Sequence, residues 1–151
     1  MNERHSYASG FWARFSCVFV VLFCLLVLSL FPTTNVLASE GITSFNQSLL
    51  AEELISLAKK GIRVRVKIDA EKAGKRKPGA LIARMRDAGI SVQSVAPNGR
   101  NHNKFAVIDG KQVITGSYNW TKKAEQNWEN LLLLNCPELA RRYAMEWERI
   151  Q

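Results

Sequence analysis

Cysteine and histidine are scarce in this chain of 151 residues, which has three of the former and two of the latter. Cys17, Cys24 and His5 lie within the first 38 residues, so the rest of the chain keeps only Cys136 and His102. One cysteine cannot form an internal disulfide, and one Cys with one His falls short of a usual zinc site. We therefore expect no cofactor and no Cys/His metal centre.

Charge is absent from residues 15–31, FSCVFVVLFCLLVLSLF. Arg4 and Arg14 precede this apolar segment, and VLA at 36–38 follows it, which is the pattern of a secretory signal peptide cleaved after Ala38. The segment is also just long enough to span a bilayer, so an uncleaved membrane anchor is the alternative. We predict a leader over 1–38 and a domain over 39–151, exported to the periplasm or secreted, or else membrane-anchored.

Acidic residues are fewer than basic ones. Without residues 1–38, which hold Arg4, Arg14 and Glu3, there remain 19 basic and 12 acidic side chains, a net charge of +7. Such an excess attracts polyanions, either nucleic acid or an anionic membrane surface, although ordinary solubility also accounts for it.

Hydrophobic periodicity predicts an α/β domain with a mixed sheet flanked by helices. The expected helices cover 47–60, 80–88 and 137–151, and the expected strands cover 62–69, 90–95, 102–108, 112–116 and 129–135, with a loop at 70–79. Strand 62–69 alternates, which predicts an exposed face with Arg63, Arg65 and Lys67. The continuous apolar run of 129–135 predicts a strand buried on both faces.

The stretch NHNKFAVIDGKQVITGSYNW, 101–120, predicts a hairpin around the Asp109-Gly110 turn. Residues two apart on a strand share a face, so His102 and Lys104 project together at one end. Ser117 and Asn119 follow the second strand and reach the same end of the sheet.

These four side chains suit a phosphodiester. Lys104 and Asn119 supply donors for the non-bridging oxygens, where charge must be held in the transition state. The imidazole of His102 attacks phosphorus or protonates a leaving oxygen near neutral pH. The alternative is an edge histidine, a solvated lysine and a plain turn.

The joint spacing, H-x-K-x4-D-x6-G-S-x-N, resembles the signature of the phospholipase D-like superfamily, the HKD phosphodiesterases. Its matching residues are His102, Lys104, Asp109, Gly116, Ser117 and Asn119. Downstream, NWEN at 127–130 resembles the N-x-E-N segment of that family, with Glu129 as its acidic member. The resemblance covers roughly residues 42–150 and is closest in pattern to the small, single-motif bacterial endonucleases. The mitochondrial cardiolipin hydrolase branch shares the hairpin.

The resemblance implies a phospholipase D-like half-domain with His102 as the nucleophile that forms a phosphohistidine. A second His102, from another subunit, would protonate the leaving oxygen, so the resemblance also implies a homodimer with a shared site. Lys104 and Asn119 would hold the phosphate, Ser117 would support that site, and Glu129 would orient His102. Asp109 would brace the hairpin.

The resemblance begins late, because family members carry a strand and a helix before the segment matched at residue 42. We therefore expect about one strand, one helix and the start of a second strand to be missing.

A basic loop adds five candidate phosphate-binding residues, Lys72, Lys75, Arg76, Lys77 and Arg100, with a plain solvated loop as the alternative. Trp120 and Trp128 are expected to pack near the hairpin rather than stack on bases. The function expected is a metal-independent phosphodiesterase acting on nucleic acid. The alternatives are a phospholipase acting at a membrane and a truncated, inactive relative that binds polyanions.

Overall fold

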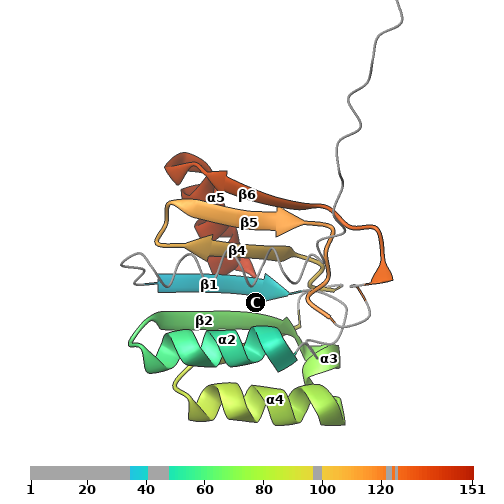
Figure 1. The fold of residues 1–151 in the computed structure, drawn as a ribbon. Helices are drawn as coiled ribbons and strands as arrows, with labels where there is room; N and C mark the ends of the chain where they lie inside the picture. Colours follow the sequence, from blue (N-terminus) through green and yellow to red (C-terminus); the bar gives the residue numbers. More distant parts are fainter. Residues whose placement is uncertain (1–34, 41–47, 97–99, 122–123, 125) are drawn as a thin grey trace, which may run out of the picture.

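The computed structural model describes residues 35–40, 48–96, 100–121, 124 and 126–151 (Figure 1). Its helices are α2 (Ser48–Lys59), α3 (Ala70–Ala73), α4 (Arg76–Asp87) and α5 (Pro137–Arg149). Its strands are β1 (Asn35–Glu40), β2 (Arg63–Asp69), β3 (Ser91–Val95), β4 (Lys104–Ile108), β5 (Gln112–Gly116) and β6 (Leu131–Asn135).

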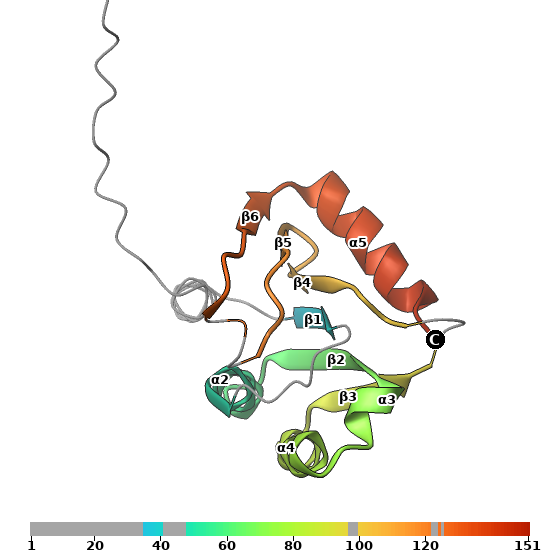
Figure 2. The same cartoon turned by 90° about the vertical axis from the view of Figure 1, so that its right-hand side faces the viewer.

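The strands form one mixed sheet in the order β3-β2-β1-β4-β5-β6. The β1–β2 and β2–β3 pairs are parallel, and the β1–β4, β4–β5 and β5–β6 pairs are antiparallel. Helices α2 and α4 lie on one face of this sheet and α5 lies on the other (Figure 2). The expected α/β class with a mixed sheet is confirmed.

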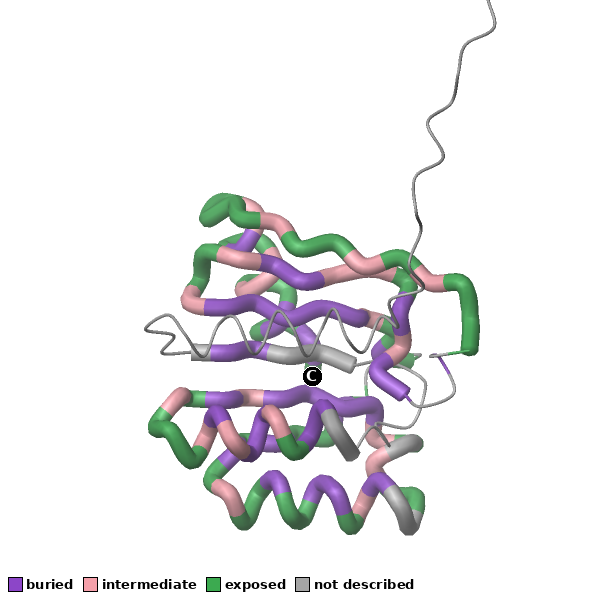
Figure 3. The backbone as a smooth tube through the Cα atoms, viewed as in Figure 1, coloured by how far each residue is buried: buried purple, intermediate pink, exposed green. Residues whose placement is uncertain are grey.

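Each face of the sheet has its own apolar core, because alternate residues of a strand point to opposite faces. Val64 and Val66 belong to the core under α2 and α4, whereas Phe105, Val107 and Trp147 belong to the core under α5. Strand β4 is buried along its whole length as a result (Figure 3).

The basic loop predicted over 70–79 is largely helical. It contains α3, and α4 begins at Arg76 rather than at residue 80. Pro78 does not prevent this helix, because it lies in the first turn of α4, where a helix needs no backbone N–H from it.

Helix α5 covers Arg65 and Lys67 on one face of β2, so the expectation of a solvent-exposed face holds for Arg63 and is wrong for Lys67. Lys67 is only 5% exposed, and its ammonium donates to the carbonyl oxygens of Trp147 at 2.8 Å and Ile150 at 2.7 Å. The Trp147 ring lies 4.1 Å from the same ammonium, a cation–π contact. Burial lowers the pKa of Lys67, although the Glu148 carboxylate opposes this shift. Lys67 thereby ties the end of α5 to the sheet.

Strand β6 is an edge strand, and the prediction that it is buried on both faces is wrong. Leu132 and Leu133 are 53% and 49% exposed, and Figure 3 shows β6 mostly exposed or half-buried. Four leucines in a row give no alternation, so the sequence could not distinguish an edge from a central strand.

Strand β1 occupies a central position between β2 and β4. The boundary predicted after Ala38 falls inside this strand, and Val36 and Leu37 are buried in the two cores. Part of the segment expected to be missing before residue 42 is therefore present. The apolar segment 15–31 lies outside the described residues, and within those residues no helix has the length and apolarity to cross a bilayer.

Candidate active site

His102 lies just before β4, in a loop held by two buried polar residues. The backbone N–H of Asn101 donates to Asp69 Oδ2 at 3.1 Å, which ties this loop to the end of β2. The Asn101 side chain in turn accepts a hydrogen bond from the backbone N–H of Asn103 at 3.3 Å. His102 itself is exposed between these anchored neighbours. The loop therefore presents the imidazole to solvent from a fixed backbone.

Sequence reasoning assigned no role to Asp69 or Asn101. The available signal was an acidic residue directly after an alternating strand, a position from which a carboxylate accepts backbone N–H groups of neighbouring loops. Both residues are buried, and Asp69 also accepts the N–H of Glu71 at 3.1 Å.

Lys104 contacts His102 directly. Its Nζ lies 3.1 Å from His102 Nδ1 and donates to the His102 carbonyl oxygen at 3.0 Å. Desolvation of the imidazole, followed by the positive charge of Lys104, lowers the pKa of His102 below its ordinary value. A lowered pKa favours the neutral imidazole, and a neutral imidazole keeps the lone pair that a nucleophile needs.

Ser117 is the centre of a second polar cluster. Its backbone N–H donates to Asn130 Oδ1 at 3.0 Å, and its hydroxyl accepts the Asn130 N–H at 3.0 Å and bonds the Glu129 carboxylate. The other oxygen of that carboxylate accepts a hydrogen bond from Asn127 Nδ2 at 3.0 Å. These contacts lock the segment 127–130 against the end of β5.

Gly116 makes this close approach possible. A Cβ atom at Gly116 would lie 2.2 Å from the carbonyl oxygen of Asn130, so no side chain fits there. The glycine of the predicted motif therefore permits a contact between two backbone segments.

Asn119 contributes an amide that the protein has not fully used. Its Oδ1 is buried and has no hydrogen-bond partner in the part of the chain that the structure describes. Its neighbours Tyr118 and Trp120 are both buried in the core under α2 and α4. The prediction that Trp120 packs near the hairpin is confirmed, whereas the same prediction for Trp128, which is 94% exposed, is wrong.

The two polar clusters lie at one end of the sheet. Phe105 pairs with Thr115, whose hydroxyl donates to the carbonyl oxygen of Lys104 at 3.2 Å, and Gly116 pairs with Leu131. The start of β4, the end of β5 and the start of β6 therefore meet at one edge, on the right in Figure 1. We call this the site end of the sheet.

Asp109 lies at the opposite end, which we call the turn end. It has a φ of 51° and precedes Gly110, with a φ of 63°, in the turn between β4 and β5. This placement agrees with a bracing role in the hairpin. It also separates Asp109 from the other residues of the motif by the length of the strands.

The predicted phosphate-binding residues are distributed around α3 and α4. Arg100 forms an exposed ion pair with Glu71 at 3.4 Å, and Lys75 is exposed just before α4. The side chains of Lys72, Arg76 and Lys77 lie outside the described part of the structure. Helix α3 directly follows β2, and Arg100 precedes β4 by a few residues. Both therefore lie next to the site end of the sheet.

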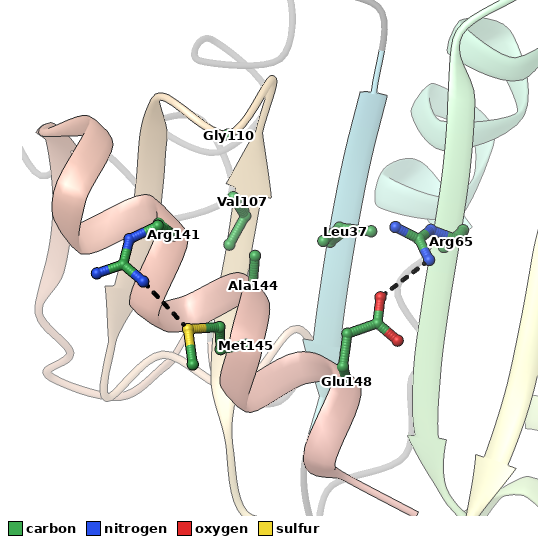
Figure 4. A pocket seen from close by; sticks show the side chains of 8 residues that line it. All are labelled: Leu37, Arg65, Val107, Gly110, Arg141, Ala144, Met145 and Glu148. Atoms are coloured by element: carbon green, nitrogen blue, oxygen red, sulfur yellow. Dashed lines mark hydrogen bonds and ion pairs between the residues drawn. The ribbon is translucent and has the colours of Figure 1, made fainter.

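A surface pocket between α5 and the sheet contains none of the predicted site residues (Figure 4). It is lined by Leu37, Val107, Ala144 and Met145 together with Arg65 and Glu148, which pair with each other at 3.2 Å. Gly110 also lines it, which places this pocket toward the turn end. In the described residues, no group of three or more His, Cys, Asp and Glu side chains is arranged to hold a metal ion.

Comparison with known proteins places this arrangement in a family. Residues 41–151 match the family model described as cardiolipin synthase, PLD-like domain. The chain belongs to the phospholipase D-like family of phosphodiesterases. The chain is 39% identical to the mitochondrial cardiolipin hydrolase of Xenopus laevis over 108 residues, which are 71% of this chain and 50% of that protein. It is 33% identical to a phospholipase D of Rickettsia prowazekii over 103 residues, 68% of this chain and 49% of that protein.

Solved structures show the same family fold. Nuc from Salmonella typhimurium, a phospholipase D family member, superposes with a TM-score of 0.77 at 25% identity over 85% of each chain. NucT from Helicobacter pylori gives a TM-score of 0.71 at 26% identity over 87% of each chain. The predicted family and fold are confirmed, while this chain spans about half the length of the curated relatives it matches.

Proposed function

We propose that this chain hydrolyses phosphodiester bonds of nucleic acid, with His102 as the nucleophile. The observation that carries this proposal is the contact between Lys104 Nζ and the His102 ring at 3.1 Å. It places a lysine ammonium beside the imidazole, so a phosphate drawn to the ammonium arrives within reach of the ring. Positioning and charge stabilisation are the main demands of phosphoryl transfer.

The proposed reaction has two steps. A ring nitrogen of His102 attacks phosphorus, a P–N bond forms, and the P–O bond to the leaving group breaks. Water then attacks phosphorus and gives a proton to the group that acted as the acid in the first step, while the P–N bond breaks and the phosphate leaves with the new oxygen. Lys104 and the amide of Asn119 hold the non-bridging oxygens in both steps.

A proton must reach the leaving oxygen in the first step. The residues that the structure describes include a single histidine, His102, so we infer that a second copy of the chain supplies the acid. A two-fold axis through the site end would bring two identical half-sites together. Ser117 and Glu129 support the phosphate site through their mutual contact. We retain the orientation of His102 by Glu129 as a proposal.

Nucleic acid is the substrate that the charge of the chain supports best. The formal net charge is +8, and Arg100, Lys75 and Lys104 lie near the site end. Phospholipid is the second candidate, because a matched relative is named mitochondrial cardiolipin hydrolase. The headgroup phosphodiester of a phospholipid presents the same reacting atoms to His102.

The test uses the full chain, purified in mild detergent and incubated in EDTA with supercoiled plasmid and, separately, with cardiolipin or phosphatidylcholine vesicles. We expect nicking and linearisation of the plasmid, loss of this activity in His102→Asn, and full activity in His5→Asn, which alters the chain's other histidine. Intact plasmid beside a folded dimer, verified by light scattering, would contradict the nuclease proposal. Cleavage of lipid but not of plasmid would show that the substrate is a phospholipid. A molten monomer without activity would support the alternative that the chain is an inactive relative.

A further inference from the structure

Trp128 is the most exposed large apolar side chain of the described residues, at 94%. Tyr118 and Trp120, which belong to the same stretch after β5, are 2% and 3% exposed. Burying an indole is strongly favourable, so a tryptophan left in water on a folded domain calls for a binding partner.

The backbone that carries Trp128 is fixed on both sides. Asn127 and Glu129 are joined by a hydrogen bond of 3.0 Å, and Glu129 also bonds Ser117. Asn130 exchanges hydrogen bonds with Ser117 in both directions. The indole therefore projects from a locked segment and pays little entropy when a ligand binds.

Trp128 also lies at the lip of the candidate site. It precedes Glu129 directly and stands three residues before Leu131, which pairs with Gly116 at the end of β5. Strand β5 lies between β6 and β4, and β4 begins at Lys104. About two strand spacings, roughly 10 Å, therefore separate β6 from β4. A substrate held by Lys104 can therefore reach Trp128.

We propose that Trp128 is a base-stacking residue that contacts a nucleotide flanking the scissile phosphate. The inference rests on the proposed function and names the residue that selects bases exposed in a single strand. An indole offers a flat π-surface to a base, and the neighbouring Gln126 and Asn127, both exposed, offer hydrogen bonds to the base edge. In a duplex the stacked bases hide these faces, so the platform favours single strands.

Contact with a bilayer fits this surface less well. The exposed Leu132 and Leu133 are consecutive on a strand and point to opposite faces of the sheet, so they form no continuous apolar patch with the indole.

The test measures binding by the full chain in the inactive His102→Asn background, in EDTA. The probes are a fluorescein-labelled oligo-dT and an abasic oligonucleotide of the same length, which keeps the phosphates and removes the bases. Stacking of one base predicts about five- to a hundredfold tighter binding of oligo-dT than of the abasic strand. We expect Trp128→Leu to remove most of this preference without weakening abasic binding, and Trp128→Phe to retain it. Met145→Ala, at an exposed site on α5, serves as the matched control.

An unchanged preference in Trp128→Leu, or equal losses on both probes, would overturn the stacking role. Loss of binding to cardiolipin vesicles in Trp128→Leu, with the oligonucleotide preference intact, would assign the indole to a membrane instead. Plasmid cleavage by the wild-type chain distinguishes failure of the stacking role from failure of the proposed function. Cleavage without a base preference overturns only the stacking role. No cleavage together with no oligonucleotide binding overturns the proposed function.

Discussion

The two ends of the central sheet serve different purposes, although the same strands reach both. At the site end, side chains of Lys104 and Ser117 contact His102 and Glu129 respectively. At the turn end, Asp109 and Gly110 adopt positive φ values that reverse the chain tightly. One sequence motif therefore combines a chemical part and a conformational part, separated by the length of a strand, and its residues are not interchangeable in role.

The direction of β1 adds to this contrast. Val36 pairs with Ile108, so the chain enters the sheet at the turn end, only a few residues after the apolar segment 15–31.

The largest effect is expected from removing the start of β1. A chain that begins at Ser39 lacks Asn35–Ala38, of which residues 36–38 pair with both β2 and β4. Val36 and Leu37 each lose about 1.5–3 kcal/mol of burial, a large share of the roughly 5–15 kcal/mol that stabilises a domain. We expect no cooperative urea transition by circular dichroism for residues 39–151.

Residues 33–151 and the full chain are the references for that experiment. A chain of residues 39–151 that unfolds at the same urea concentration as the full chain would show that β1 is dispensable. N-terminal sequencing of the protein made in cells supplies a second measurement. A start at Ser39 in a stably folded product would support the predicted signal-peptide boundary after Ala38.

Two glycine substitutions compare the ends directly. Gly116→Ala forces a Cβ into the carbonyl of Asn130, so we expect a loss of more than about 3 kcal/mol together with release of the segment 127–130. Gly110→Ala meets no neighbouring atom and carries only the strain of a φ of 63°, about 1–2 kcal/mol. Urea unfolding of both variants measures the difference, and equal losses would refute the distinction between close contact and turn strain.

Lys67→Met should loosen the end of α5 that lies over the site end. The variant keeps the length of the side chain but loses charge-assisted hydrogen bonds to two carbonyl oxygens, worth about 1.5–3 kcal/mol each at most. We expect a lower free energy of unfolding in urea and faster amide exchange at Ile150. Lys111→Met, an exposed lysine at the turn end, is the control and should change neither; a silent Lys67→Met would mean that α5 packing alone holds the helix.

The smallest effect concerns pH. Desolvation and then Lys104 lower the pKa of His102, so its neutral form persists below pH 6.5 and the acid limb of activity lies below that value. Lys104→Met removes the charge but not the desolvation, so the pKa of His102 should rise toward its ordinary value without reaching it. NMR titration of the His102 ring protons measures both proteins; an unchanged or lower pKa in the variant would contradict the charge contact.

The sequence was sufficient for the features that depend on local pattern. The hairpin, the helices after residues 47 and 136, and the placement of His102, Lys104 and Ser117 at one end of the sheet follow from periodicity and turn chemistry. The family followed from the spacing of the motif. These signals are short in range, and each can be read within about twenty residues.

Features that depend on tertiary context could not be predicted. Lys67 has the alternation of an exposed residue, and only the position of α5 buries it. The Leu131–Leu134 run has the composition of a central strand, yet β6 lies at an edge with no further strand beside it among the described residues. VLA at 36–38 satisfies both a cleavage pattern and a buried strand, and nothing local distinguishes the two.

The most direct test of the account is to trap the phosphohistidine. A single-stranded oligonucleotide is mixed with the full chain, and the reaction is stopped with alkali, which preserves the P–N bond. The mass of the peptide that contains residue 102 is then measured by mass spectrometry. The account predicts a nucleotide or phosphate adduct on His102 in the wild-type chain and in His5→Asn, and none in His102→Asn. Rapid turnover without an adduct, or an adduct on any other residue, would contradict it.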